Sequence, residues 1–314
     1  MKKILAVYYT QTGQLYNALN SVLEPLRNSS DIEITELEIK PKKIFPFPWP
    51  FFEFIDAFPE SVALEPCEIE PIALDKNEKY DLIILAYQVW YLNPSQPITA
   101  FLQSKYAASI LKDTPVITLI GCRNMWLNAQ EVVKGYLNTY GAELIGNIAL
   151  VDKGSTAETF YTTPKWLLTG EKNFKYLTPA GISEDDIKGS SRFGKAILEK
   201  IKNELKLDQT ILQGLNAVKV DAKLIGAEKT GIRAFKIWSK IIRKIGKPGD
   251  KLRRLGLIVW FMCLLIGIVT VVPISALIRK FFAISNSDQY QKLKEKYELP
   301  SGSDNYNIDK YTSN

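Results

Sequence analysis

The sequence of 314 residues contains no histidine. This absence excludes Ser-His-Asp triads, Cys-His pairs and His-ligated metal sites from the chain. Its three cysteines, Cys67, Cys122 and Cys263, stand at unrelated spacings. They fit neither a disulfide framework nor a metal site, and they agree with a reducing compartment. We therefore expect no metal centre, and any chemistry to come from a bound cofactor or from Tyr, Asp, Glu, Lys, Arg and Cys side chains.

Two phosphate-binding signatures are also missing. The chain has no Gly-x-Gly-x-x-Gly and no Gly-Lys-Ser/Thr, so neither a dinucleotide fingerprint nor an NTPase loop is indicated. The net charge is +6, but the basic excess is concentrated between Lys229 and Arg254. A local basic cluster predicts an anionic surface as partner, a membrane rather than a nucleic acid.

Short apolar runs alternate with amphipathic helical patterns over residues 1–208. Continuous apolar strands interleaved with helices predict an α/β fold, a doubly wound five-stranded parallel sheet covered on both faces. Ligands of such sheets bind at the carboxyl ends of the strands. The expected strands are Ile4–Tyr9, Ile32–Ile39, Leu82–Tyr87, Val116–Ile120 and Leu144–Val151, and the expected helices lie near Gly13–Arg27, Pro97–Ala108, Trp126–Tyr140 and Arg192–Lys206.

The loop after the first strand offers hydroxyl groups and the N-terminus of a helix, which suits a phosphate group. Its Thr-x-Thr-Gly pattern resembles the FMN-phosphate loop of flavodoxins, although Leu15 stands where that motif usually has Thr. The resemblance implies FMN as the cofactor and a flavodoxin-like fold. The residues it assigns to FMN binding are Thr10, Gln11, Thr12, Gly13, Gln14 and Leu15.

Two later loops extend this resemblance. The loop after the third strand resembles the flavin-stacking loop of flavodoxin-like quinone reductases, with Trp90 and Tyr91 as ring-stacking aromatics; Trp90 as a plain core residue is the alternative. The loop after the fourth strand would edge the flavin, where Arg123 or Asn124 could stabilise negative charge. The residues assigned to FMN in these loops are Gln88, Val89, Trp90, Tyr91, Cys122, Arg123, Asn124 and Trp126. Cys122 is more simply read as a buried small residue than as a nucleophile.

Two insertions accompany the predicted sheet. Residues 41–75 carry a Pro- and aromatic-rich stretch, Phe45 to Phe54, which either covers the domain's own core or walls a pocket for a hydrophobic substrate. Residues 152–188 follow the fifth strand at the end of the sheet where they could close over a flavin. Tyr161, Asp152 and Glu158 of this insertion are candidates for proton transfer, with solvated loop residues as the alternative. We predict catalytic roles for Arg123, Asn124 and Tyr161.

The last third of the chain changes character. Residues 209–254 form a linker with a basic amphipathic helix suited to an anionic bilayer, and residues 255–284 form a membrane segment. Its uncharged run from Gly256 to Ile278 is long enough to span, although Pro273 could kink or split it; a buried core helix is the alternative. The basic flank predicts the inner membrane, with the N-terminal domain facing the cytoplasm. A polar tail, 285–314, is expected to be loosely ordered.

The whole pattern is similar to one bacterial family, the flavodoxin-like "dialkylresorcinol condensing enzyme", which accompanies a ketosynthase in pigment biosynthesis. The match rests on Phe45–Trp49, Tyr87–Tyr91, Ile120–Trp126, Ser191–Gly194 and the apolar segment. Ketosynthase-type condensation uses Cys with His partners, which this chain lacks. The resemblance therefore implies an FMN-dependent dehydrogenase that aromatises a dialkyl cyclohexanedione, with a hydrophobic substrate and a ketosynthase partner. The alternatives are a membrane-tethered quinone reductase or electron carrier, and a flavin-free scaffold.

Overall fold

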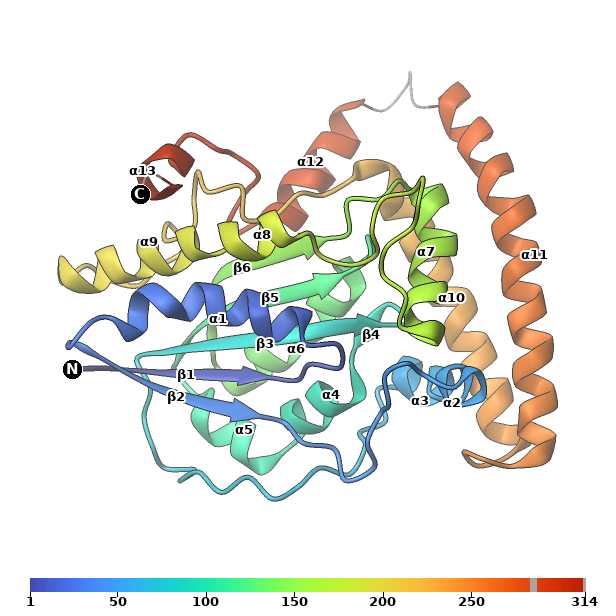
Figure 1. The fold of residues 1–314 in the computed structure, drawn as a ribbon, viewed down its shortest axis with the longest axis horizontal. Coiled ribbons are helices and arrows are strands. Elements are labelled where there is room, and N and C mark those ends of the chain that lie inside the picture. The colour runs from blue at the N-terminus through green and yellow to red at the C-terminus, as the bar shows by residue number, and fades with distance from the viewer. Residues whose placement is uncertain (283–286, 313–314) are drawn as a thin grey trace.

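The parallel sheet predicted from the apolar runs is present in the computed structural model, which describes residues 1–282 and 287–312 (Figure 1). Its strand order is β2-β1-β3-β5-β6, and each neighbouring pair is parallel. This is the flavodoxin-like order of a doubly wound sheet. A two-residue strand, β4, pairs antiparallel with the end of β3 and was not predicted. The strands are β1 (Lys2–Tyr8), β2 (Ile32–Glu38), β3 (Leu82–Trp90), β4 (Asn93–Pro94), β5 (Pro115–Cys122) and β6 (Glu143–Val151).

Helices cover both faces of the sheet, as two separate buried clusters of apolar side chains show. One face packs against α1 (Gln14–Arg27), α8 (Glu184–Gly189) and α9 (Ser191–Lys202); the other packs against α4 (Gln96–Leu102), α5 (Lys105–Ile110) and α6 (Leu127–Tyr140). Helices α1 and α9 cross closely at Gly194, where a Cβ atom would lie 1.9 Å from the carbonyl oxygen of Val22. The α/β flavodoxin-like fold class is thus confirmed.

Both insertions fold at the carboxyl end of the sheet (Figure 1). The aromatic insertion forms two short helices, α2 (Phe51–Asp56) and α3 (Phe58–Ala63), which begin only after the run of alternating prolines ends at Pro50. The second insertion forms α7 (Thr156–Thr169), whose start is fixed by a capping box between Ser155 and Glu158. The backbone N–H of Trp49 donates to the carbonyl oxygen of Leu167 at 2.7 Å, so the two insertions contact each other.

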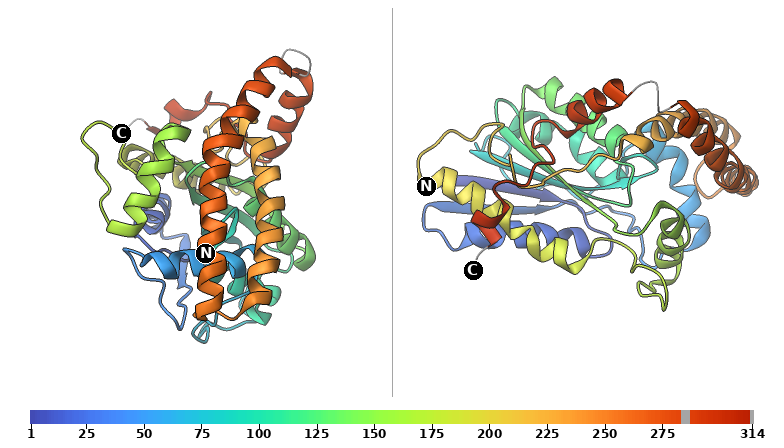
Figure 2. Two further views of the ribbon diagram at one scale, coloured as in Figure 1. Left: turned by 90° about the vertical axis from the view of Figure 1, so that its right-hand side faces the viewer. Right: turned by 90° about the horizontal axis from the view of Figure 1, so that it is seen from above.

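The C-terminal third builds a pair of long helices beside the insertions, α10 (Ala222–Ile245) and α11 (Lys251–Phe282), which lie side by side in Figure 2. Helix α11 runs through Pro273 without a break. In the described part of the chain one helix, α11, is long and apolar enough over Lys251–Thr270 to cross a membrane, judged by length and composition. Much of the apolar side of α10 is covered, since Ile232 and Ile242 are buried against α3 and α11, whereas Ile241 is 43% exposed.

The polar tail packs on the domain, in contrast to the loose order expected for it. It contains α12 (Ser287–Glu298) and α13 (Ile308–Thr312). Ser301 accepts a hydrogen bond from the backbone N–H of Asn147 on the edge strand β6, at 2.7 Å, and Lys310 forms an ion pair with Glu199 on α9. The tail therefore covers a sheet edge that would otherwise be exposed. Residues 283–284 of the predicted membrane segment, and 285–286 and 313–314 of the tail, lie outside the described residues.

Candidate functional site

A cavity of about 240 Å³ lies where the loops after β1, β3 and β5 meet, at the carboxyl end of the sheet. This is the position at which doubly wound sheets bind ligands. Both insertions complete its wall. The lining residues are Gln11, Thr12, Gln14, Leu15, Trp49, Phe54, Gln88, Val89, Trp90, Tyr91, Gly121, Cys122, Arg123, Asp152, Thr163, Trp166, Leu167, Gly181 and Ile182.

The loop after β1 is held in shape without a ligand. Gly13 has φ +81° and forms the left-handed residue just before α1. The hydroxyl of Thr10 accepts a hydrogen bond from the Gly13 N–H at 3.1 Å. Thr12 and Gln14 then face the cavity, while Leu15 is buried against the sheet. The loop presents a helix N-terminus to the cavity, which is an arrangement that favours an anion.

The end of the second insertion is tied to this loop. The side-chain oxygen of Gln14 accepts the Ile182 N–H at 3.2 Å. Asp152 accepts the N–H of Gly154 at 2.8 Å and the N–H of Gly181 at 2.7 Å, one on each carboxylate oxygen. Gly181 has φ +87°, a left-handed conformation that favours glycine, and a Cβ atom there would lie 2.3 Å from the Gln14 side-chain oxygen. Asp152 thus clamps the two ends of the insertion over the cavity.

The loop after β3 turns through two non-glycine residues with positive φ, Tyr91 (+49°) and Leu92 (+67°). These residues connect Trp90 to its antiparallel partner Asn93, as in a two-residue hairpin of type I′. Such φ values at bulky residues are strained by about 1–2 kcal/mol each. Trp90 lines the cavity and also packs against Trp49, with ring centroids 4.9 Å apart. It is therefore both a wall residue and a core residue.

Tyr91 also contacts the cavity, but its hydroxyl group points elsewhere. The hydroxyl donates a hydrogen bond to the carbonyl oxygen of Phe54 on α2. Burial raises the pKa of Tyr91 well above its usual value, so the group stays protonated. Tyr91 therefore joins the loop after β3 to the aromatic insertion and offers only its ring to a ligand.

Arg123, in the loop after β5, brings a positive charge to the cavity. Its guanidinium group lies 4.2 Å from the centroid of the Phe160 ring on α7. Burial lowers the pKa of Arg123 to about 10, partly offset by the nearby carboxylate of Asp152, so it is still charged at neutral pH. The neighbouring Cys122 has its pKa raised by burial, which keeps it a neutral thiol and supports its reading as a buried small residue.

The cavity collects buried polar atoms that have no hydrogen-bond partner within the protein. Seven such side-chain atoms occur among the described residues, and four of them belong to residues that line this cavity: Trp49 Nε1, Gln88 Oε1, Arg123 Nε and Thr163 Oγ1. Leaving a buried donor or acceptor unpaired costs about 1–3 kcal/mol. A concentration of them in one cavity is the pattern expected where a polar ligand supplies the missing partners.

The structure brings most of the predicted cofactor residues together. Ten line the cavity: Gln11, Thr12, Gln14, Leu15, Gln88, Val89, Trp90, Tyr91, Cys122 and Arg123. Thr10 and Gly13 do not line the cavity, but the hydrogen bond between them shapes the first loop. Asn124 and Trp126 are also absent from the wall, and Trp126 is buried in the core with 2% of its surface exposed. Tyr161 is 56% exposed and packs against Phe174, outside the wall. The roles predicted for these five residues, like the FMN-binding roles of the ten lining residues, stay predictions.

Several wall residues were not assigned to the site from the sequence. Trp49 and Phe54 belong to the Pro- and aromatic-rich stretch, whose composition suggested a pocket wall without assigning either residue to the site. Thr163, Trp166 and Leu167 come from α7, whose residues carry no motif. Gly181 and Ile182 reach the site only through their contacts with Gln14 and Asp152, which sequence patterns do not encode.

No family model matches the chain, and no curated protein matches it. Among solved structures, a flavoprotein in complex with FMN from Lactobacillus acidophilus NCFM is similar with a TM-score of 0.38 and 20% identity, covering 48% of this chain and 93% of that one. A flavodoxin from the domain Archaea has a TM-score of 0.35 and 12% identity, covering 64% and 99%. A flavodoxin, WrbA-like protein from Agrobacterium tumefaciens has a TM-score of 0.36 and 10% identity, covering 65% of this chain and 99% of that one. The flavodoxin-like fold of this chain rests on its own strand order.

Proposed function

We propose that the cavity binds FMN and that the protein is an FMN-dependent oxidoreductase. The observation that carries this proposal is a cavity at the carboxyl end of a flavodoxin-like sheet whose lining includes four residues with unpaired polar atoms. The fold suggests the class of ligand, and the polar groups of these residues support a polar one. When bound, FMN would supply a two-electron acceptor.

The residues of the three loops fit the parts of FMN. The first loop, with Thr12 and the N-terminus of α1, offers a hydroxyl and backbone donors for the phosphate group. Trp90 supplies a flat aromatic wall for the flavin ring. Gln88 Oε1 can accept a hydrogen bond from the ring edge, and Arg123 can stabilise negative charge on a reduced flavin. Arg123 is the one member of the predicted catalytic set that lines the cavity.

The other two unpaired atoms come from the insertions and favour a second ligand. Trp49 Nε1 and Thr163 Oγ1 are unpaired donors of two lining residues, and their neighbours in the wall are largely aromatic and aliphatic. Two donors in apolar surroundings suit the two oxygens of a hydrophobic cyclic dione. We propose that the substrate is a dialkyl cyclohexane-1,3-dione or its enol tautomer, a dialkyl 3-hydroxycyclohexenone. It loses one hydride to the acceptor and one proton, and then tautomerises to a dialkylresorcinol. A ketosynthase that makes the ring is the proposed partner.

The partial cover of the cavity favours an enzyme over an electron carrier. Helix α7 and Trp49 both contribute to the wall, and the hydrogen bond from the Trp49 N–H to the Leu167 carbonyl joins them. This cover shields part of the cavity from water, and it also separates that part from a large redox partner. A quinone reductase is the second candidate, because a quinone also presents two oxygens to Trp49 and Thr163.

The test separates flavin binding from substrate binding. Thr163→Val removes one insertion donor with little change of shape, and Trp49→Phe removes the other while keeping an aromatic ring in the wall. We expect FMN affinity to be unchanged and kcat/KM for an alkylated cyclohexane-1,3-dione to fall about tenfold for each variant, the effect of one lost hydrogen bond. Thr169→Val is the matched control, since its hydroxyl bonds the Lys165 carbonyl on the exposed end of α7.

Three outcomes decide between the candidates. Turnover of the dione by the FMN-loaded protein, reduced in the two variants and not in the control, supports the proposed reaction. FMN binding with reduction of a quinone and no turnover of the dione would replace it by the quinone reductase. Failure to bind FMN would leave only the scaffold function and contradict the proposal.

A further inference from the structure

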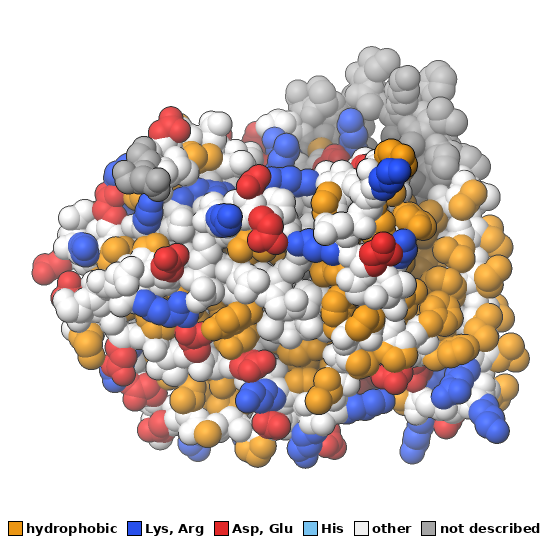
Figure 3. Space-filling model, viewed as in Figure 1, with side chains coloured by type: hydrophobic (Ala, Val, Ile, Leu, Met, Phe, Trp, Pro, Cys, Tyr) orange, Lys and Arg blue, Asp and Glu red, His pale blue; other side chains and the backbone are white. Residues whose placement is uncertain are grey.

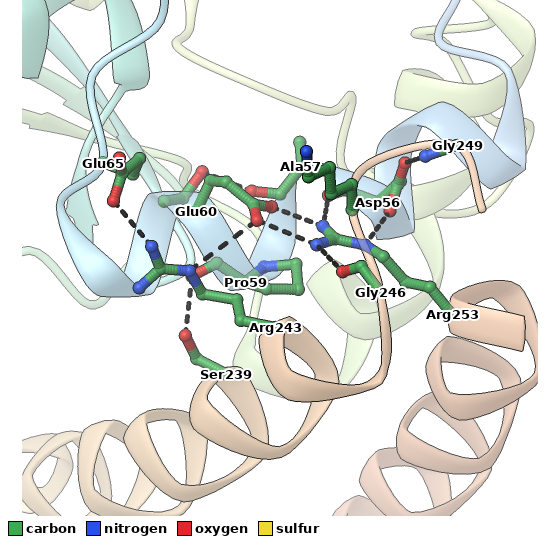
Figure 4. A network of polar contacts seen from close by, with 12 residues as sticks. Asp56, Ala57, Pro59, Glu60, Glu65, Ser239, Arg243, Gly246, Gly249 and Arg253 are labelled. Carbon is green, nitrogen blue, oxygen red and sulfur yellow. Dashed lines mark hydrogen bonds and ion pairs between the residues drawn. The ribbon is translucent and has the colours of Figure 1, made fainter.

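The turn between α10 and α11 is latched to the aromatic insertion by Arg253 (Figure 4). This side chain is 1% exposed. Its Nε lies 2.6 Å from a carboxylate oxygen of Asp56, and its Nη1 lies 2.9 Å from Glu60. Asp56 also accepts the N–H of Gly249 in the turn at 2.8 Å. The first turn of α11 is therefore fixed to α2 and α3 by charge-assisted hydrogen bonds.

Aromatic packing continues this attachment along α11. Trp260 stacks on Phe58 of α3, with ring centroids 3.6 Å apart and planes at 12°. Phe261 packs on Phe51 of α2 at 5.2 Å, and Leu264 contacts the same cluster. Helix α11 thus lies against the globular domain from Arg253 to Leu264.

This attachment is incompatible with a membrane span by the same residues. The candidate span, Lys251–Thr270, contains Arg253, Trp260 and Phe261. To cross a bilayer it would have to leave the domain, and that would expose Phe58 and unpair Arg253. From Leu265 to Ile278 the helix rises only about 21 Å, less than the roughly 30 Å of a hydrocarbon core.

The outward side of α11 is apolar and has no cover in the described structure. Its exposed side chains follow helical spacing and form a stripe, which we call the α11 stripe: Leu255, Ile258, Val259, Met262, Leu265, Ile266 and Val269. Figure 3 shows hydrophobic side chains gathered along α11 at the right edge of the molecule. Leu255, Ile266 and Val269 are 60%, 58% and 73% exposed.

Positive charge borders the α11 stripe. Exposed basic residues lie on α10, in the turn and at the start of α11: Arg233, Lys236, Lys240, Lys244, Lys247, Lys251 and Arg254. In the sequence from Lys229 to Thr270, Asp250 is the single acidic residue, and its carboxylate accepts the Lys247 N–H. An apolar stripe with a basic border matches the acyl and phosphate layers of an anionic membrane surface. Two copies joined through this surface would instead bring their basic borders together.

We propose that the α10–α11 hairpin is a monotopic membrane anchor, with the α11 stripe lying in the plane of an anionic phospholipid interface and the globular domain beside it. The buried apolar residues of α10, Ile232 and Ile242, have no part in this contact, because they pack on α3 and α11. The proposal does not depend on the flavin chemistry.

Native Cys263 gives a direct test, because it is exposed between Val259 and Ile266. The full-length protein is labelled at Cys263 with an environment-sensitive thiol fluorophore and mixed with phosphatidylglycerol/phosphatidylcholine vesicles carrying nitroxide-labelled lipids at shallow or deep positions. Val259→Cys, Ile266→Cys and Thr270→Cys, each in a Cys263→Ser background, extend the measurement along the helix. Cys263→Ser alone measures labelling of Cys67 and Cys122, whose pKa values are raised by burial.

We expect binding to anionic but not neutral vesicles, and stronger quenching by the shallow label at all four positions. Met262→Glu should weaken binding at least tenfold, while Leu205→Glu, which places the same charge at an exposed apolar residue of the domain, should not. A steady change in depth from Val259 to Thr270 would show a span and overturn the proposal. Absence of vesicle binding, or no effect of Met262→Glu, would overturn it as well.

Discussion

Replacing Arg253 by Met tests whether α11 is part of the folded domain. The substitution keeps the length of the buried side chain but removes the guanidinium group that joins Asp56 to Glu60. Breaking a buried ion pair from one side costs about 3–5 kcal/mol, because the other charges lose their partner. The side chains of Asp56 and Glu60 are 18% and 15% exposed, so water still reaches both carboxylates, and Asp56 also keeps its hydrogen bond from the Gly249 N–H. We therefore expect a loss near the lower end, about 3 kcal/mol.

The assay is urea unfolding of the full chain in detergent, followed by tryptophan fluorescence. Arg254→Ala is the matched control, because Arg254 is exposed and its guanidinium lies 5.6 Å from the Phe52 ring; we expect a change of at most about 0.5–1 kcal/mol. Adding Asp56→Asn and Glu60→Gln to Arg253→Met should recover part of the loss, since no unpaired charge then remains. Equal midpoints for Arg253→Met and Arg254→Ala would refute the packing of α11 on the domain.

Two further predictions concern stability. Gly194→Ala should destabilise the protein by more than about 2 kcal/mol in chemical denaturation, because the added Cβ would clash with the Val22 carbonyl. Gly135→Ala in α6 is the control: its Cβ would meet open space, and we expect it to stabilise the protein by roughly 0.5–1 kcal/mol. Equal effects of the two substitutions would contradict the close crossing of α1 and α9. Burial raises the pKa of Glu228 to about 7 from 4.5 although it accepts the Asn128 N–H, so the folded state holds a proton that the unfolded state has released. Stability should fall between pH 4.5 and 7, by roughly 3 kcal/mol at most, and Glu228→Gln should flatten this fall.

Much of the sheet could be predicted because buried parallel strands have continuous runs of apolar residues in the sequence. Ile4–Tyr9 and Leu82–Tyr87 needed only small changes of boundary to become β1 and β3. The three cavity loops followed, since each is the carboxyl end of a predicted strand. Short-range patterns of hydropathy therefore located the site.

What the sequence could not supply were contacts between distant segments. Tyr161 was a reasonable proton donor by residue type, but α7 is oriented so that Tyr161 faces outward. That orientation depends on contacts with distant segments, such as the hydrogen bond from Trp49 to Leu167 of α7. The apolar side of α10 predicted a membrane contact, yet much of that side packs against α3. The tail is mostly polar, and its order depends on contacts with the distant domain, such as the hydrogen bond from Asn147 to Ser301 and the packing of Leu293 and Tyr297 on the core.

The measurement that tests the central claim most directly is titration of the purified full-length protein with FMN. Trp49, Trp90 and Trp166 line the cavity, so binding can be followed by quenching of their fluorescence together with the flavin absorption spectrum. We predict one FMN per chain, and at least tenfold weaker binding after Arg123→Ala but not after Arg254→Ala. No bound flavin after addition of FMN, or equal binding by both variants, would contradict the assignment of this cavity.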